Sequence, residues 1–201
     1  MFTGLIQCIG RVQGNPQPLQ AGGQRLQIDL SGWSYQPSLG ASIAVNGCCL
    51  TVAAVSGEIA SFDVIRQTLD LTTLGSLTPN DAVNLEHATT PETLLGGHLV
   101  QGHVDTVGEV EFLNQSSEAC RCRIQFDRRY EALLVPQGSV TVDGVSLTIA
   151  DLGEGWFEVA LIPTTLVETT FGQYAAGDGV NLEWDVIAKM VERQMAARAG
   201  N

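Results

Sequence analysis

Two pairs of aligned residues carry the chemical interest of this sequence, because each pair places different side chains at matching positions of an internal repeat. Cys49 aligns with Ser146, so a thiol in the first copy corresponds to a hydroxyl in the second. Leu5 aligns with His103, so only the second copy has an imidazole there, the group best suited to exchanging protons near neutral pH. Thr148 adds a further hydroxyl beside Ser146. Residues shared by both copies suit binding, so we expect catalysis to depend on the positions where the two copies differ.

The repeat covers most of the chain and predicts two homologous units. The sequence VNGCCLTV at Val45–Val52 aligns with VDGVSLTI at Val142–Ile149, an offset of 97 residues. With the same offset, Thr68–Ala88 matches Thr165–Asp185, and ten of these 21 positions are identical. Near the start of each copy the offset becomes 98, because Gly4 matches Gly102. We therefore expect domains at residues 1–97 and 98–185, followed by a separate segment at 186–201.

Each unit has the pattern of a small all-β barrel. The dipeptides Asn46-Gly47 and Asp143-Gly144 interrupt β-branched runs and supply the positive φ angles of a tight hairpin turn. Short helical turns are expected at Thr68–Leu74 and Thr165–Phe171, each of which ends near a glycine. The runs of strand length at a spacing typical of closed barrels are Leu26–Leu30, Ser42–Val55, Ile59–Ile65, Val83–Ala88, Val104–Val110, Arg123–Phe126, Ser139–Leu152, Trp156–Ile162 and Val180–Trp184.

The end of the chain changes from strand-forming to helix-forming residues. Val186–Arg198 is rich in good helix formers, and Asp185 is placed to cap its first turn. An apolar stripe with helical spacing runs along it, made of Ile187, Met190, Val191 and Met195. From the pattern alone, this stripe either folds back on a barrel or pairs with the same helix of other subunits.

Composition narrows the class of protein. A net charge of -12 argues against nucleic acid and against an anionic membrane surface as partners. The five cysteines are odd in number and lack zinc-site spacing, so reduced thiols and no metal are expected. No apolar run reaches the roughly 20 residues of a membrane span, and the start of the chain does not resemble a signal peptide. We expect a cytoplasmic protein with a small uncharged substrate.

Five motifs in family order make the chain resemble the riboflavin synthases. The resemblance extends from Met1 to about Met195. Its motifs are MFTG at Met1–Gly4, NGCCLT at Asn46–Thr51, GGHLVQGHV at Gly96–Val104, DGVSLT at Asp143–Thr148 and IPTTL at Ile162–Leu166.

The resemblance implies a fold, an assembly and a reaction. The fold would be two six-stranded Greek-key barrels, and the C-terminal helices would join three chains into a homotrimer. The reaction would convert two molecules of 6,7-dimethyl-8-ribityllumazine into riboflavin and 5-amino-6-ribitylaminouracil, with no cofactor because the electrons stay within the two lumazines. The N-terminal barrel of one subunit would face the C-terminal barrel of its neighbour. A complex of the trimer with lumazine synthase stays open.

The resemblance also implies two substrate pockets, each assigned to one barrel. In the N-terminal barrel the pocket would be formed by Gly4, Leu5, Ile6, Cys49, Leu50, Thr51, Asp63, Val64, Ile65, Arg66, Gln67 and Thr68. In the C-terminal barrel it would be formed by Gly102, His103, Val104, Gln137, Ser146, Leu147, Thr148, Ala160, Leu161, Ile162, Pro163, Thr164 and Thr165. Gly4 and Gly102 would let the backbone approach a ligand closely.

Within these pockets four residues are candidates for catalysis. His103 would move or polarise the proton of the lumazine C7 methyl group, and Ser146 and Thr148 would activate the nucleophile or hydrogen-bond the adduct. Cys49 would add to the substrate or orient it, or is simply a small buried apolar side chain. We interpret His87 and His98 as structural. Asp185 is a helix cap, with a role in the active site as the alternative.

Three positions depart from the family pattern, and one rival function remains. Gln137 replaces a frequent lysine, so a charge near the second ligand is missing. Gln67 and Thr164 stand where glutamate or histidine is common. The rival is a lumazine- or flavin-binding protein without catalysis, of the kind associated with luminescence, in which the catalytic-type residues of the second repeat are lost.

Overall fold

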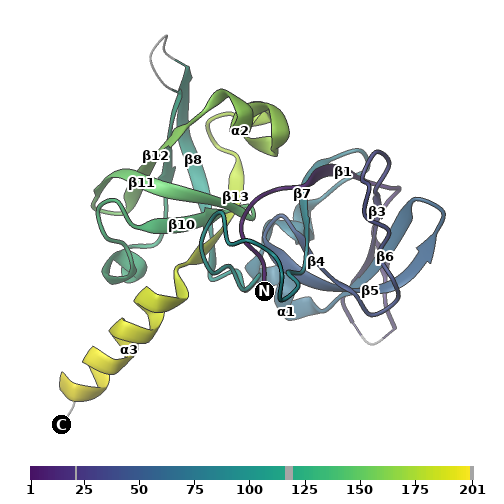
Figure 1. The fold of residues 1–201 in the computed structure, drawn as a ribbon, viewed down its shortest axis with the longest axis horizontal. Coiled ribbons are helices and arrows are strands. Elements are labelled where there is room, and N and C mark those ends of the chain that lie inside the picture. The colour runs from purple at the N-terminus through teal and green to yellow at the C-terminus, as the bar shows by residue number, and fades with distance from the viewer. Residues whose placement is uncertain (21, 116–119, 200–201) are drawn as a thin grey trace.

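Residues 1–20, 22–115 and 120–199 are described by a computed structural model, in which two antiparallel β-barrels in tandem precede one helix (Figure 1). Six strands of the first barrel close in the order β1-β7-β4-β5-β6-β3, because β1 also pairs with β3. The two-residue strand β2 extends this sheet beside β3. The elements are β1 (Cys8–Val12), β2 (Gln17–Pro18), β3 (Gln24–Asp29), β4 (Ser42–Val45), β5 (Cys48–Ser56), β6 (Ile59–Val64), α1 (Arg66–Leu71), η1 (Thr73–Ser76) and β7 (Ala82–His87).

The second barrel repeats this plan and closes in the order β10-β11-β12-β9-β8-β13. In both barrels three hairpin-connected strands are joined by an earlier strand that lies beside the last of them, which is a Greek-key arrangement. The predicted fold class is therefore confirmed. The elements are β8 (Thr106–Gln115), β9 (Cys120–Gln125), η2 (Arg128–Leu133), β10 (Ser139–Val142), β11 (Val145–Gly153), β12 (Trp156–Leu161), α2 (Pro163–Glu168), η3 (Thr170–Gln173) and β13 (Gly179–Trp184).

Sequence patterns located most strands but missed β1 and placed the short helices too late. In β1, Gly10 interrupts the apolar pattern because a Cβ there would lie 2.6 Å from the Leu85 side chain. The helices α1 and α2 begin at Arg66 and Pro163, just after the strands that precede them. The strand predicted to end at Val110 continues to Gln115 past a bulge.

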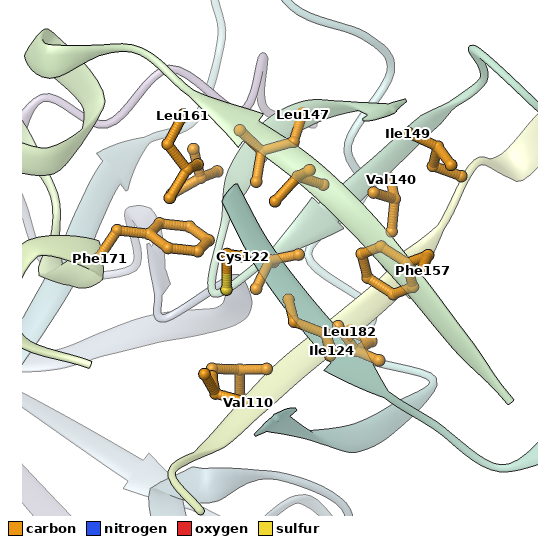
Figure 2. Close-up of a cluster of buried hydrophobic side chains, with 14 of the residues drawn as sticks. Val110, Cys122, Ile124, Val140, Leu147, Ile149, Phe157, Leu161, Phe171 and Leu182 are labelled. Atoms are coloured by element: carbon orange, nitrogen blue, oxygen red, sulfur yellow. The ribbon is translucent and has the colours of Figure 1, made fainter. Parts of the chain in front are cut away.

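Each barrel encloses its own apolar core. In the second barrel, Ile124, Phe157 and Leu182 pack in the interior, and Cys122 belongs to the same buried cluster (Figure 2). The first barrel is filled by the corresponding side chains of its own strands, among them Phe62 and Leu85. All five cysteines are free thiols. The buried ones therefore serve as small apolar side chains.

The two barrels meet where their hairpin turns face each other. Asn46 and Asp143 have the positive φ expected for these turns, and a Cβ on Gly47 would lie 2.6 Å from the Gly144 nitrogen. The asparagine of each VNLE motif then reaches across the contact. Asn181 donates from Nδ2 to the Asn46 carbonyl (2.8 Å), and Asn84 donates to the Asp143 carbonyl (2.9 Å). The repeat thus produces a reciprocal joint about an approximate twofold axis.

One side of this joint carries a buried acid that the other side lacks. Asp143 accepts hydrogen bonds from the Tyr174 hydroxyl and from the Asn181 N–H, whereas Asn46 and Leu77 occupy the equivalent positions of the first repeat. Complete burial raises the pKa of the Asp143 carboxyl to about 7, and the two hydrogen bonds oppose this rise.

The C-terminal helix α3 (Val186–Ala199) extends away from both barrels (Figure 1). Asp185 caps it, as predicted, by accepting from the Ile187 N–H at 2.9 Å. An ion pair of Lys189 with Asp105 at 2.8 Å ties its first turns to the second barrel. The predicted apolar stripe stays exposed, with Met190 64% and Met195 66% accessible, so within one chain it does not fold back on a barrel. No helix in the described ranges is long and apolar enough to cross a membrane.

Replacing Asp143 with Asn should remove a pH dependence from the stability of the protein. The pKa of about 7 lies above the ordinary aspartate value of 3.8, so between these values the folded state holds a proton that the unfolded state has released. The free energy of unfolding therefore falls as the pH rises through this window, by up to about 4 kcal/mol from this group. The D143N variant should lose this fall, because an amide carries no charge.

Urea unfolding of wild type, D143N and the exposed control E109Q at about pH 5 and about pH 8 measures this effect. We expect D143N to be stabilised relative to wild type more at the higher pH, and E109Q to differ from wild type equally at both. A D143N difference that is the same at both pH values would contradict the prediction.

Candidate functional site

The segments that lead into the two barrels cross each other. Phe2 and Val100 pair antiparallel, with N–H to carbonyl distances of 2.7 and 3.2 Å. Beyond this pairing, the Gly4 carbonyl accepts from the Ser146 N–H of β11 at 2.8 Å. The Gly102 carbonyl accepts from the Cys49 N–H of β5, also at 2.8 Å. Each glycine segment therefore forms a backbone hydrogen bond with a strand of the opposite barrel.

This crossing corrects the predicted pockets. Gly4, Leu5 and Ile6 were assigned to the first barrel, yet Ile6 packs against the core of the second. Gly102, His103 and Val104 were assigned to the second, yet Val104 packs against the core of the first. The assignment was wrong because an internal repeat shows which residues are equivalent, but not which barrel a connecting segment contacts.

The first-barrel site is a pocket of about 340 Å³ that contains Cys49. His103 lies on its wall, so the imidazole shares a site with Cys49 rather than with Ser146. The His103 side chain is exposed, and its backbone N–H donates to Glu183 at 2.9 Å. The lining residues are Cys48, Cys49, Ile65, Gln67, Thr68, Leu71, Thr72, Gly102, His103 and Val104.

The second-barrel site contains a histidine that sequence reasoning dismissed as structural. His98 lies with Nδ1 2.7 Å from the Ser146 Oγ and Nε2 3.0 Å from the Thr141 Oγ1. Burial lowers the pKa of His98 and so favours the neutral ring, whereas the nearby Asp185 carboxylate acts in the opposite direction. A neutral imidazole has one nitrogen that accepts and one that donates, so this ring can orient the Ser146 hydroxyl.

A signal for His98 was present in the sequence. His98 belongs to the same GGHLVQGHV motif as His103 and precedes it by only five residues.

The two sites differ in polarity at matching positions. Thr141 and Ser146 are cross-strand partners in the second barrel, and Ala44 and Cys49 are the equivalent partners in the first. Phe2, Ala44 and Val100 form a small buried apolar cluster against which Cys49 packs. Ser146 instead meets the His98 ring. The repeat therefore builds the same backbone twice, once with a hydroxyl network and once with an apolar wall.

Strand alternation removes some predicted side chains from the sites. Leu50 and Leu147 point into the barrel cores, as do Val64 and Leu161. These four side chains cannot line a ligand pocket on the outside of the barrel, because neighbouring strand residues face opposite sides of a sheet. Thr51 and Thr148 are exposed on the same side as Cys49 and Ser146 and stay available.

The remaining predicted residues lie at the starts of α1 and α2 or near them, except Gln137, which precedes β10. Asp63 is held by Arg25 through two bonds of 2.6 and 2.8 Å, and Arg66 pairs with Asp70. Gln137 is exposed and has a φ of 62°, where the first repeat has Gly40 at 83°. The other members are exposed or half-buried: Ile65, Gln67, Thr68, Ala160, Ile162, Pro163, Thr164 and Thr165.

Within residues 1–20, 22–115 and 120–199, no group of three or more His, Cys, Asp or Glu side chains is placed to hold one metal ion.

Two barrels that bear matching sites define a protein with two lumazine-binding domains, since the family model for that domain matches residues 3–88 and 101–185. A solved structure described as LumP complexed with 6,7-dimethyl-8-(1'-D-ribityl) lumazine is similar over 91% of this chain and 98% of that one, with a TM-score of 0.79 and 26% identity.

Curated relatives named riboflavin synthase match almost the whole chain. The one from Mycobacterium tuberculosis is 45% identical over 97% of this chain and 98% of its own length. The one from Bacillus subtilis is 39% identical over 96% of this chain and 89% of its own. The chain belongs to the riboflavin synthase family.

Replacing Gly4 with Ala should destabilise the protein more than the same change at Gly14. Both glycines have positive φ, at 78° and 66°, so both substitutions strain the backbone by about 1–2 kcal/mol. A Cβ on Gly4 would lie 2.5 Å from the Ser146 Cβ, whereas a Cβ on Gly14 has nothing within 4 Å. Urea unfolding should give G4A an additional loss of about 1–3 kcal/mol from overpacking. Equal losses for the two variants would show that the close approach of Gly4 to Ser146 is not tight.

Proposed function

We propose that this chain is a transferase that converts two molecules of 6,7-dimethyl-8-ribityllumazine into riboflavin and 5-amino-6-ribitylaminouracil, the last step of riboflavin formation. One observation carries the proposal. A single chain builds the same strand-and-glycine site twice, on Cys49 with Gly102 and on Ser146 with Gly4. A reaction that consumes two copies of one molecule needs two related binding sites.

The differences between the sites suit the different fates of the two molecules. One lumazine gives up a four-carbon unit and the other receives it, so a proton must leave the C7 methyl group of one and a nucleophile must add at C7 of the other. The electrons and the transferred carbon atoms all stay within the two substrates, so the reaction requires no cofactor. Holding the pair in a reactive orientation supplies up to about 7–11 kcal/mol of the barrier.

Four side chains are proposed to act on the substrates in these steps, and a fifth, His98, acts through one of them. His103 and Cys49 serve the first-barrel site, where His103 moves the proton and Cys49 adds to or orients the substrate. Ser146 serves the second-barrel site, where His98 can polarise its hydroxyl. Thr148 is exposed on the same face of β11 as Ser146, and its hydroxyl donates a hydrogen bond to the developing adduct. The remaining exposed or half-buried residues of the candidate pockets bind the heterocycle and its ribityl chain.

A homotrimer with its active sites between subunits belongs to the same proposal. Three residues of the α3 stripe, Ile187, Val191 and Met195, line a groove of about 740 Å³. Leu133 and Val135 of the second barrel line the same groove. Exposed apolar surface of this extent favours association with further copies of the chain. Facing barrels of neighbouring chains would then bring the two lumazines together. We further propose a cytoplasmic location, and a complex with lumazine synthase as a source of substrate.

A lumazine- or flavin-binding protein without catalysis is the alternative function. Its support is the fold shared with the lumazine complex of LumP at 26% identity. The higher identities, 36–45% over nearly the full chain, are with relatives named riboflavin synthase. The catalytic reading is therefore the better supported of the two.

Incubation of the purified protein with 6,7-dimethyl-8-ribityllumazine tests the reaction. We expect riboflavin to appear as lumazine is consumed two for one, and H103A to lower kcat by about 100-fold or more, because a positioned acid or base contributes that much. The control is H87Q, since the His87 ring packs against Trp33 and Tyr35 and does not line the Cys49 pocket. Tight binding without riboflavin would favour the alternative function, and full turnover by H103A would remove the role given to His103.

Changing the α3 stripe tests the assembly. V191E places a charge on the exposed stripe, in the groove. It should convert trimers into monomers that bind lumazine without turning it over. The control R193Q changes the net charge by the same amount on another side of the helix. Sedimentation equilibrium and the riboflavin assay measure both properties. A wild type that is monomeric and fully active would contradict the inter-subunit site.

A further inference from the structure

Two buried glutamates, one in each VNLE motif, bind the glycine segments. Glu86 of β7 accepts at Oε1 from the Thr3 N–H (2.6 Å) and the Thr3 hydroxyl (2.7 Å), and at Oε2 from the Gly4 N–H (2.9 Å). Its side chain belongs to a residue only 2% exposed. The carboxylate is therefore committed to this one segment of backbone.

Glu183 of β13 binds the matching segment in the second barrel, with the His103 N–H as third donor in place of a hydroxyl. It accepts from the Gln101 N–H at 2.6 Å, and from the Gly102 and His103 N–H groups at 2.8 and 2.9 Å. It is also 2% exposed. Glu86 and Glu183 occupy matching positions of the repeat, so both copies keep a carboxylate for the same purpose.

The chemistry of this contact requires two acceptor oxygens. Each carboxylate receives three donors on its two oxygens, and hydrogen bonds to a charged acceptor are stronger than those between neutral groups. A glutamine of the same shape has one acceptor oxygen and an NH₂ group that would face a backbone N–H. The segment would then lose bonds at one end and meet a second donor.

Each glutamate lies on one barrel but orders a segment that completes the site of the other. Glu86 holds Gly4, whose carbonyl accepts from Ser146 of the second barrel. Glu183 holds Gly102 and His103, which line the Cys49 pocket of the first barrel. Both glycines have a φ near +80°, so the turn that presents their carbonyls depends on the held N–H groups.

We infer that Glu86 and Glu183 are positioning residues that act crosswise: Glu86 shapes the ligand site at Ser146, and Glu183 shapes the ligand site at Cys49. The inference rests on the proposed function for the identity of the ligand. It adds that the affinity of each site is set by a side chain of the opposite barrel.

Single-site backgrounds separate the two ligands in a binding experiment. Thr51 and Thr148 are exposed beside Cys49 and Ser146, so T51W should block the first site and T148W the second. Calorimetric titration with 6,7-dimethyl-8-ribityllumazine then reports on one site at a time. Adding E86Q should weaken binding about tenfold or more in the T51W background and leave the T148W background unchanged.

E183Q should give the reverse pattern, and the matched control E158Q should change neither background. Glu158 of β12 is also a mostly buried glutamate, but it pairs with Arg123 of β9 rather than with a glycine segment. A glutamine variant that weakens binding at the site of its own barrel, or at both sites equally, would overturn the inference. A general loss of structure would affect both sites and would not give the crosswise pattern.

Two further measurements apply if a glutamine variant folds poorly. E86D and E183D keep both acceptor oxygens and should recover part of the affinity in the same crosswise pattern. Amide hydrogen exchange should speed up at Gly4 in E86Q and at Gly102 in E183Q. Unchanged exchange would count against the inference. Turnover by wild type decides the proposed function separately, since a protein that binds crosswise but forms no riboflavin would retain the inference and lose the reaction.

Discussion

The structure depends on two reciprocal backbone hydrogen bonds, from Ser146 N–H to the Gly4 carbonyl and from Cys49 N–H to the Gly102 carbonyl. Each donor belongs to a strand of one barrel, and each acceptor belongs to the segment that leads into the other. Neither barrel therefore carries a complete site by itself. The joint between the barrels, with its exchanged asparagine amides, holds the two halves at the distance that these bonds need.

A shared backbone with different side chains explains how one chain treats two copies of a molecule differently. Both sites present a strand N–H already bonded to a glycine carbonyl, so the frame is the same. Around Ser146 the frame carries a hydroxyl and an imidazole, and around Cys49 it carries an apolar wall and an exposed His103. Hydrogen-bonded groups in a partly buried site tune proton positions in a way that an apolar wall does not.

Three buried carboxyl groups lie where a barrel contacts a glycine segment or where the two barrels meet. Burial raises the pKa of Asp143, Glu86 and Glu183, and in each case the donated hydrogen bonds oppose the rise. A buried carboxyl is costly unless donors surround it, and backbone N–H groups of turns and crossing segments are such donors. The acidic residues of these motifs thus connect barrels and segments rather than merely solubilising the chain.

The sequence by itself determined the two barrels, their hairpin turns, the capped C-terminal helix and the family, because repeat spacing, residue pairs such as Asn46-Gly47 and strand alternation are local signals. Only the tertiary structure decided which residues share a site. Gly4 and Gly102 each contact the barrel opposite to the one predicted. His103 lies in the site of Cys49, and His98 lies beside Ser146. Leu50 and Leu147 turned inward, although the motif around each was located correctly. The reason is physical: contacts between residues 48 to 142 positions apart depend on how the chain crosses itself, and a repeat aligns equivalent residues without fixing that path.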